Sequence, residues 1–174
     1  LMFLPKIDIL TWEDTSKKMA WGTLFLFGVG ISLGSAIIST KAGIWLAKSI
    51  VPFFGLSYSS AFMILAILAL FLIIIHLGFA SATALAAAMI PIVISMLQEV
   101  KTPGLNIIGM TMILQYVISF GFILPVNAPQ NMIAYGTDTF TVKEFIKTGI
   151  PLTIIAYGLI LLLAATYWKW IGLV

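Results

Sequence analysis

The sequence predicts an all-α integral membrane protein, and its composition and charge spacing support this prediction. Apolar residues make up 61% of the 174 positions and charged residues only 9%, whereas soluble domains are about 25% charged. No formally charged residue occurs between Lys48 and Glu99, and the stretch 102–137 is also uncharged. A bilayer core about 30 Å thick needs roughly 20 apolar residues per spanning helix. The uncharged stretches therefore have room for several segments at membrane depth, which predicts a multi-pass protein.

The charged and reactive residues argue against several classes of function. All nine cationic residues are lysines, so the arginine forks typical of nucleic-acid recognition are missing and no nucleic-acid partner is expected. The lack of cysteine removes disulfides, zinc–thiolate sites and thiol nucleophiles. His76 is the only histidine, and Glu99 is the only acid between Lys48 and Lys101. These residues supply no nucleophile–base pair and no metal cluster, so we expect neither an enzyme nor a bound cofactor.

Residues 1–19 are expected to form an interfacial approach to the membrane. The segment mixes charged residues with apolar ones, and Thr11 or Asp14 is suited to cap a short helix there. It lacks the basic-then-apolar order and the small-residue cleavage site of a signal peptide. The chain begins with Leu1 rather than methionine, so it is expected to be part of something longer.

Residues 20–56 are expected to form a spanning helix followed by an amphipathic helix. The stretch 20–38 has the length of a span and carries four glycines, a pattern that favours close packing against another helix. The stretch 39–54 sets Trp45 among lysines, which suits a helix in the headgroup region of the lipid bilayer. We expect Pro52 and the glycine after it to end this helix. Because lysines flank the first span on both sides, their count does not select an orientation.

Residues 57–100 are predicted to form a re-entrant helical hairpin. Small and polar residues at 76–83 divide the segment into apolar arms of roughly 17 and 14 residues, and the second arm would cover only about 21 Å. Pro91 weakens that arm further as a complete crossing. Irregular backbone at membrane depth is tolerated only where it is buried in protein or lines an aqueous cavity. The tip of the hairpin is therefore expected to face a binding site.

Residues 103–136 are predicted to form a broken transmembrane helix. A span-length run over 105–126 meets Pro125 and Pro129, which remove backbone hydrogen bonds. Asn127 and its neighbour four residues on supply amides to the freed backbone groups. This composition indicates an unwound segment.

Residues 141–174 are predicted to form the C-terminal transmembrane helix. Thr141 is a plausible start for a helix, and the apolar run extends from Ile150 to the last residue. Tyr167, Trp168 and Trp170 lie near its end and have the composition of an interfacial aromatic belt.

Two breaks at membrane depth are the candidate functional features, because secondary transporters use discontinuous helices to hold anions and cations. The hydroxyls of Ser81 and Thr83, with the N–H groups that open the following helix, are suited to bind a carboxylate without a fixed charge. The alternative is an ordinary small-residue loop. The second break contains Asn127, Ala128 and Pro129, and its alternative is a proline kink whose amides only satisfy freed backbone.

His76 is the remaining candidate, because an ionisable side chain at membrane depth is costly and is often functional. The alternative is a neutral, hydrogen-bonded buried imidazole.

Three motifs together resemble the C-terminal half of the divalent anion/sodium symporter family, over nearly the whole chain. The first is Phe27-Gly28-Val29-Gly30, which continues to Leu33-Gly34. The second is Ser81-Ala82-Thr83, which partly matches the Ser-Asn-Thr tip motif of the family. The third runs from Leu124 to Asn131 and approximates Leu-Pro-Val-Ala-Thr-Pro-Pro-Asn. Members of this family transport dicarboxylates and tricarboxylates, and some carry sulfate.

The resemblance implies one inverted repeat of an elevator-type secondary transporter, which functions as a homodimer and needs an N-terminal half that is missing here. It implies transport of C4 or C5 dicarboxylates such as succinate, malate or 2-oxoglutarate in a bacterial plasma membrane. The substrate-binding residues would be Ser81, Ala82, Thr83, Asn127, Ala128 and Pro129. The sodium position would be formed by Ala80, Ala82 and Asn127.

The chain departs from the family pattern at two positions, and other functions stay open. Ala82 has no amide where the motif has Asn, and Ala128 has no hydroxyl where the segment has Thr. We therefore hypothesise that a protonated His76 replaces the sodium charge and makes the protein an exchanger rather than a symporter. The alternatives are a transporter of sulfate or another inorganic anion, and a small structural membrane subunit. A channel would need a continuous polar pore lining, which the two separate breaks do not supply.

Overall fold

The computed structural model describes residues 12–18 and 39–174 and, between these ranges, residues 21, 25, 28, 29, 32, 35 and 36. All regular structure in this part of the chain is helical. The α-helices are α1 (Trp12–Lys18), α3 (Ala42–Phe53), α4 (Ala61–His76), α5 (Ala82–Glu99), α6 (Ile107–Ile118), α7 (Pro129–Tyr135), α8 (Val142–Ala165) and α9 (Tyr167–Trp170). Two short 3-10 helices, η1 (Leu56–Tyr58) and η2 (Pro125–Asn127), complete the order.

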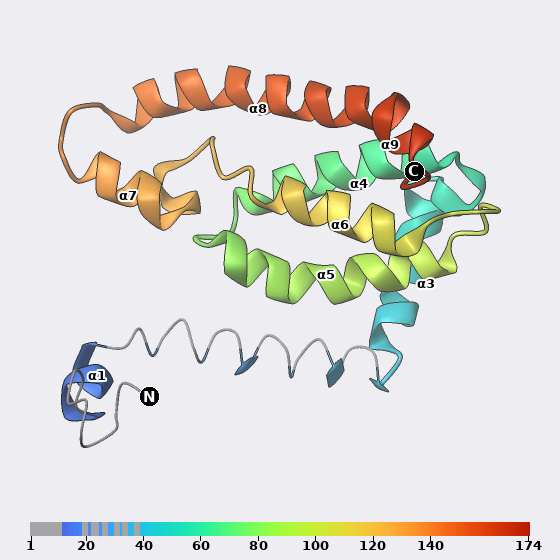
Figure 1. Ribbon diagram of the computed structural model, residues 1–174, viewed down its shortest axis with the longest axis horizontal. Helices are drawn as coiled ribbons and strands as arrows, with labels where there is room; N and C mark the ends of the chain where they lie inside the picture. The colour runs from blue at the N-terminus through green and yellow to red at the C-terminus, as the bar shows by residue number, and fades with distance from the viewer. Residues whose placement is uncertain are drawn as a thin grey trace.

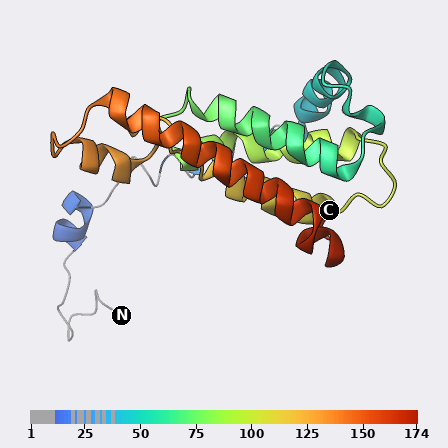
Figure 2. The same ribbon diagram turned by 90° about the horizontal axis from the view of Figure 1, so that it is seen from above.

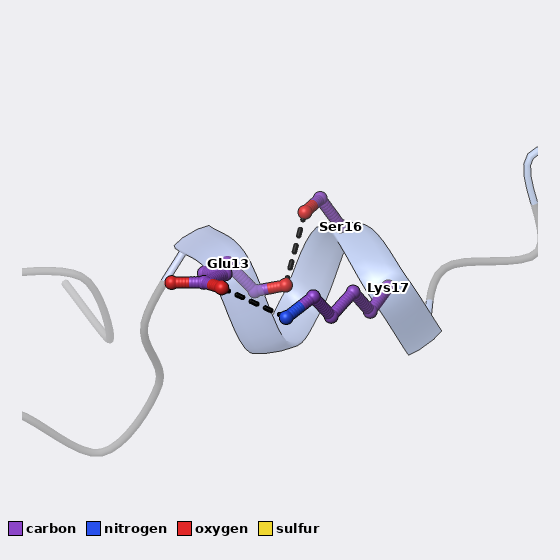
Figure 3. Close-up of polar contacts among 3 residues, drawn as sticks. All are labelled: Glu13, Ser16 and Lys17. Carbon is purple, nitrogen blue, oxygen red and sulfur yellow. Dashed lines mark hydrogen bonds and ion pairs between the residues drawn. The ribbon is translucent and has the colours of Figure 1, made fainter.

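The helix α1 is short and polar. Lys17 Nζ lies 2.8 Å from Glu13 Oε1, and the Ser16 hydroxyl donates a 3.0 Å hydrogen bond to the Glu13 carbonyl (Figure 3). A Glu–Lys pair in this order and at this spacing stabilises a helix modestly. The interfacial role predicted for residues 1–19 stays a prediction. The span predicted at 20–38, with its glycine run, lies mostly outside the described residues, although Trp21 and the other described positions in it are helical.

The core of the molecule is formed by α4, α5 and α6, with α6 lying between the other two (Figure 1). Buried leucines on α4 face buried Ile113, Leu114 and Val117 on α6. The helix α3 packs along α5 through Ala47 and Val51, which are buried. Lipid is as apolar as these side chains, so close packing rather than exclusion of water holds such helices together in a membrane.

Two described helical stretches are long and apolar enough to cross a membrane. They are α5, with 18 residues, and the 29-residue stretch Val142–Trp170 that contains α8 and α9. The helix α8 has 24 residues and is about 36 Å long. It runs obliquely along α4 (Figure 2). The Tyr157 hydroxyl joins the two helices by donating a 3.0 Å hydrogen bond to the Ala66 carbonyl of α4.

The amphipathic segment after the first span differs from its prediction at its end. Pro52 lies inside α3 rather than after it. Its ring affects only the preceding turn, and the Pro52 carbonyl accepts the N–H of Gly55. Gly55, with φ of 66°, then turns the chain into η1. A left-handed backbone of this kind favours glycine.

The second arm of the hairpin is longer than predicted. The helix α4 has 16 residues and α5 has 18, so α5 covers about 27 Å. The additional length comes from its two ends, since the helix begins at Ala82, two residues before the expected start at 84, and continues to Glu99. Pro91 lies within α5 without ending it. That the hairpin re-enters the membrane rather than crossing it stays a prediction.

The helix before the second break ends earlier than the prolines suggest. The helix α6 has 12 residues and stops at Ile118, so the expected run to Val126 is wrong in its last third. The Ser119 hydroxyl donates to the Tyr116 carbonyl at 2.6 Å, and the Gly121 N–H donates to the Ser119 carbonyl at 2.8 Å. These two bonds turn the chain before Pro125 is reached.

The helix α8 begins where the sequence indicates a helix start. The Thr141 hydroxyl accepts the Glu144 N–H at 3.3 Å, and the Glu144 carboxylate accepts the Thr141 N–H at 2.8 Å. This reciprocal pair is a capping box. Pro151 lies inside the helix, which ends before Thr166, and α9 carries the aromatic residues predicted for the interface.

Candidate functional site

The first break is a tight turn between α4 and α5. The N–H groups of Leu77, Gly78 and Phe79 donate to the carbonyls three positions earlier at 3.2, 3.0 and 3.0 Å. The chain then extends at Ser81, whose φ and ψ are −160° and 124°, before α5 begins at Ala82. The tip therefore exposes the N-terminal end of an 18-residue helix.

Several donors at the start of α5 are not used within the described part of the chain. Ser81 Oγ accepts the Ala84 N–H at 3.4 Å, which leaves the hydroxyl proton of Ser81 available. The Thr83 hydroxyl and the N–H groups of Ala82 and Thr83 make no hydrogen bond with any described residue. Free N–H groups and the helix dipole attract negative oxygens at such an end. The methyl side chain of Ala82 adds no donor.

Asn127 joins the second break to the first. Its side-chain amide donates to the His76 carbonyl at 2.7 Å and to the Phe79 carbonyl at 2.8 Å. Its side-chain oxygen accepts the Leu124 N–H at 3.1 Å. The structure thus brings the tip at 77–81 beside the unwound segment, and one buried side chain connects them, since Asn127 is only 1% exposed.

The remaining residues of the second break make contacts within that segment or begin the next helix. The Asn131 amide donates to the Gly121 carbonyl at 2.7 Å. Ala128 is extended and buried, and Pro129 is the exposed first residue of α7. The Asn127 amide is therefore bonded to backbone carbonyls of the first break, and the Asn131 amide to a backbone carbonyl of the second. A role of Asn127, Ala128 or Pro129 in binding substrate stays a prediction, and Asn127 would have to exchange its present bonds to donate to an anion.

The predicted sodium position lies at the same junction. Ala80 belongs to the tip, Ala82 is the first residue of α5, and Asn127 contacts the tip through its amide. Two carbonyls of the turn, those of His76 and Phe79, are already occupied by that amide. Within the described part of the chain, no three His, Cys, Asp or Glu side chains lie close enough together to hold a metal ion. A sodium ion there would depend on backbone carbonyls, and this position stays a prediction.

His76 is enclosed by both breaks. The residue is 2% exposed, and neither ring nitrogen has a hydrogen-bond partner among the described residues. The Asn127 carbonyl lies beside the ring but outside hydrogen-bond geometry. A Cβ placed on Gly121 would lie 3.2 Å from Cε1 of the ring. The acid nearest in sequence, Glu99, lies at the opposite end of α5, so a charged imidazole would need an anion to balance it.

A cavity of about 370 Å³ opens beside the tip. It lies between the first turns of α5 and the last turns of α6. Its polar lining residues are Thr83, Gln115 and Ser119, and its apolar lining residues are Ala82, Ala86, Ala87 and Ile118. The sequence shows Gln115 and Ser119 as polar insertions in an apolar run, and they were not assigned to the site. The signal available in the sequence was their spacing of four residues, which places both side chains on one face of a helix.

Gly149 was also missed by the sequence analysis. It lies on α8 where the unwound segment crosses that helix, and a Cβ placed there would lie 2.0 Å from the Phe122 carbonyl oxygen. No side chain other than hydrogen fits at this crossing. The unwound segment is therefore held against α8 on one side and against the hairpin tip on the other.

Comparison with known proteins gives a family for the whole chain. The family described as "Sodium:sulfate symporter transmembrane region" matches residues 1–174. A "Membrane protein" of Cupriavidus necator is 53% identical over 99% of the chain, which covers 33% of that protein. The "Sodium-dependent dicarboxylate transporter SdcS" of Staphylococcus saprophyticus is 28% identical over 88% of the chain and 28% of its own length. The human "Na(+)/dicarboxylate cotransporter 3" is 25% identical over 92% of the chain and 25% of its own length.

Proposed function

The chain belongs to the sodium:sulfate symporter family of membrane transporters, and from this premise we propose that it is the C-terminal half of a secondary transporter for C4 or C5 dicarboxylates. The chain spans about a third or less of the length of the relatives compared above. The proposal therefore includes an N-terminal half that contributes a second tip to the site. Two relatives are named as dicarboxylate transporters, which favours a dicarboxylate as the substrate and transport rather than enzymatic chemistry.

The observation that carries the proposal is the set of unused donors at the tip beside the second break. Ser81, Thr83 and two backbone N–H groups offer hydrogen bonds to an anion without any lysine nearby in sequence. Such a site binds a carboxylate weakly enough to release it on the other side of the membrane, as transport requires. The twofold bond from Asn127 keeps the tip and the break together.

We propose that this joined unit moves as one body. An elevator-type mechanism carries substrate with a rigid bundle that slides against a scaffold, and the scaffold would be formed by the homodimer. The two carbonyl bonds of Asn127 and the close crossing at Gly149 connect α4, α8 and the unwound segment. Rigid connections of this kind support the movement of the whole site rather than of a single helix.

The coupling ion is proposed to be sodium, because relatives are named as sodium-dependent. Exchange without sodium is the second mode, and among the described residues of the junction His76 is the one side chain that can supply a positive charge in place of the ion. In that mode the bound dicarboxylate provides the negative charge that balances the imidazolium of His76.

Sulfate is the second candidate substrate, because the description of the matching family names it. A tetrahedral dianion is compatible with the same hydroxyl and N–H donors at the start of α5. The two candidates differ in length rather than in charge, so direct competition distinguishes them.

Uptake into liposomes tests the proposal. The full-length transporter that contains this chain is reconstituted, and labelled succinate is supplied with a sodium gradient, without sodium, and against internal succinate. We expect saturable uptake that malate and 2-oxoglutarate compete for, and stimulation by a sodium gradient or by internal substrate. Trans-stimulation would distinguish a carrier from a channel. If neither succinate nor sulfate is taken up under any of these conditions, the proposed function is wrong.

A further inference from the structure

The exposed face of α6 changes from apolar to polar along its length. Ile108 and Met112 are exposed on its first turns, and Gln115 and Ser119 follow on the same side. The polar part of the face begins where α6 reaches the hairpin tip and lines the cavity beside Thr83. The polarity is thus confined to the part of the face that is adjacent to the proposed anion site.

No partner among the described residues explains the presence of the Gln115 amide. It makes no hydrogen bond with any residue in the described ranges, whereas the Ser119 hydroxyl is occupied by the Tyr116 carbonyl at 2.6 Å. Leaving an amide unpaired in hydrocarbon costs roughly several kcal/mol. Polar side chains within membranes therefore face water, a protein partner or a ligand. Gln115 lines a cavity of about 370 Å³, which supplies the room for a ligand.

Thr83 and Gln115 reach that cavity from different helices. The Thr83 hydroxyl comes from the start of α5 and the Gln115 amide from the end of α6. We expect an anion with two carboxylates to contact both residues at once, and a compact tetrahedral anion bound at the start of α5 to contact only Thr83. The amide offers two N–H donors and no charge, so it can bind a second carboxylate and still release it.

We propose that Gln115 is a specificity-determining residue that binds the second carboxylate of the substrate and so favours dicarboxylates over sulfate. This inference rests on the proposed function, in which Ser81 and Thr83 bind the first carboxylate. It assigns to the α6 wall of the cavity a role that the family motifs at the tip and at the break do not include.

The test compares two substitutions of Gln115 in the reconstituted full-length transporter. Gln115→Leu removes the amide, and Gln115→Glu keeps the shape but opposes a carboxylate. We expect Gln115→Leu to raise the KM for succinate about tenfold, the loss expected for one hydrogen bond to a charged group, with Vmax nearly unchanged. The effect of Gln115→Glu should be larger. The inhibition constant of sulfate for succinate uptake should change by less than about twofold in either variant, because sulfate is bound by the tip alone.

Tyr116→Phe and Met112→Leu serve as controls, since both residues are exposed on α6 but do not line the cavity. Equal KM values for succinate in the parent, Gln115→Leu and Gln115→Glu would overturn the inference while the proposed function stands. An equal shift in the KM for succinate and in the inhibition constant of sulfate would also overturn it, because Gln115 would then not discriminate between the two anions. A parent protein that transports neither anion would remove the proposed function itself, and the inference with it.

Discussion

The side-chain amide of Asn127 donates a 2.7 Å hydrogen bond to the backbone carbonyl of His76, 51 positions earlier in the chain. The same amide reaches Phe79, so both of its hydrogens are used to hold the end of one helix and the turn that follows it. In water such carbonyls would find other donors, but at membrane depth they depend on the protein. Asn127 is therefore first of all the connection between the two breaks.

Replacing Asn127 should separate the two breaks. Asn127→Ala leaves the Phe79 carbonyl without the donor that Asn127 supplies, whereas the His76 carbonyl keeps the N–H of Phe79. We expect a cost of about 1–3 kcal/mol for the one acceptor left unsatisfied. We expect a lower midpoint of thermal unfolding for the full-length protein in detergent and loss of transport. Asn127→Asp should be worse, because a carboxylate placed against two carbonyl oxygens repels them.

Gln130→Ala is the matched control for this substitution, since Gln130 is exposed on α7 next to the same break and its side chain makes no hydrogen bond in the described structure. Its unfolding midpoint should equal that of the parent. If Asn127→Ala unfolds no earlier than Gln130→Ala, the connection between the breaks does not contribute to stability.

Gly149→Ala should destabilise the protein through a backbone clash. The new Cβ would lie 2.0 Å from the Phe122 carbonyl oxygen and 2.8 Å from its carbon, so either α8 or the unwound segment must move. A backbone atom cannot yield as the end of a flexible side chain can, and overpacking of this kind costs about 1–3 kcal/mol or more. Thermal unfolding and the fraction of protein that elutes as a folded species measure the effect.

Gly158→Ala on the same helix gives the opposite expectation. A Cβ placed on Gly158 meets no atom within 4 Å, and alanine favours a helix over glycine by about 1 kcal/mol. The midpoint of thermal unfolding of Gly158→Ala should equal that of the parent or be higher. A decrease of the same size in both variants would indicate a general intolerance of α8 to substitution and would contradict the specific clash at Phe122.

Local signals in the sequence predicted the helices well where a single turn decides the structure. Thr141 was predicted to start a helix, and its hydroxyl accepts the N–H of the residue three positions later. Ser81 caps α5 in the same way, although the sequence analysis expected that helix to begin after Thr83. The end of α6 was not predicted, because Ser119 and Gly121 turn the chain through bonds within the loop rather than through Pro125.

Relationships between distant segments could not be predicted from residue patterns alone. The bond from Asn127 to His76 and the crossing of Gly149 with Phe122 depend on how separate helices pack. The polarity of Gln115 was visible in the sequence, but its place on the wall of the cavity required the arrangement of α5 against α6. The candidate residues of the tip and of the break were therefore found by motif, and their partners only by structure.

Thr83→Val should weaken substrate binding without unfolding the protein. Valine keeps the branched shape of threonine and removes the hydroxyl, which makes no hydrogen bond in the described structure. We expect the KM for succinate to rise about tenfold, and Thr83→Ser to stay close to the parent. Thr111→Val is the control, because the Thr111 hydroxyl donates to the Ile107 carbonyl within α6. Equal KM values for Thr83→Val and Thr111→Val would argue against a role of the Thr83 hydroxyl.

His76→Gln distinguishes the two modes of coupling. Glutamine retains a polar side chain of similar reach but cannot carry the positive charge that exchange without sodium requires. Because both ring nitrogens lack partners within the described part of the protein, the substitution breaks no side-chain hydrogen bond, and the unfolding midpoint should change little. We expect counterflow of labelled succinate in sodium-free buffer to fall to the background of empty liposomes, while uptake driven by a sodium gradient persists. If sodium-free counterflow continues in His76→Gln, the imidazole does not supply the balancing charge, and the charge must come from elsewhere in the full-length transporter.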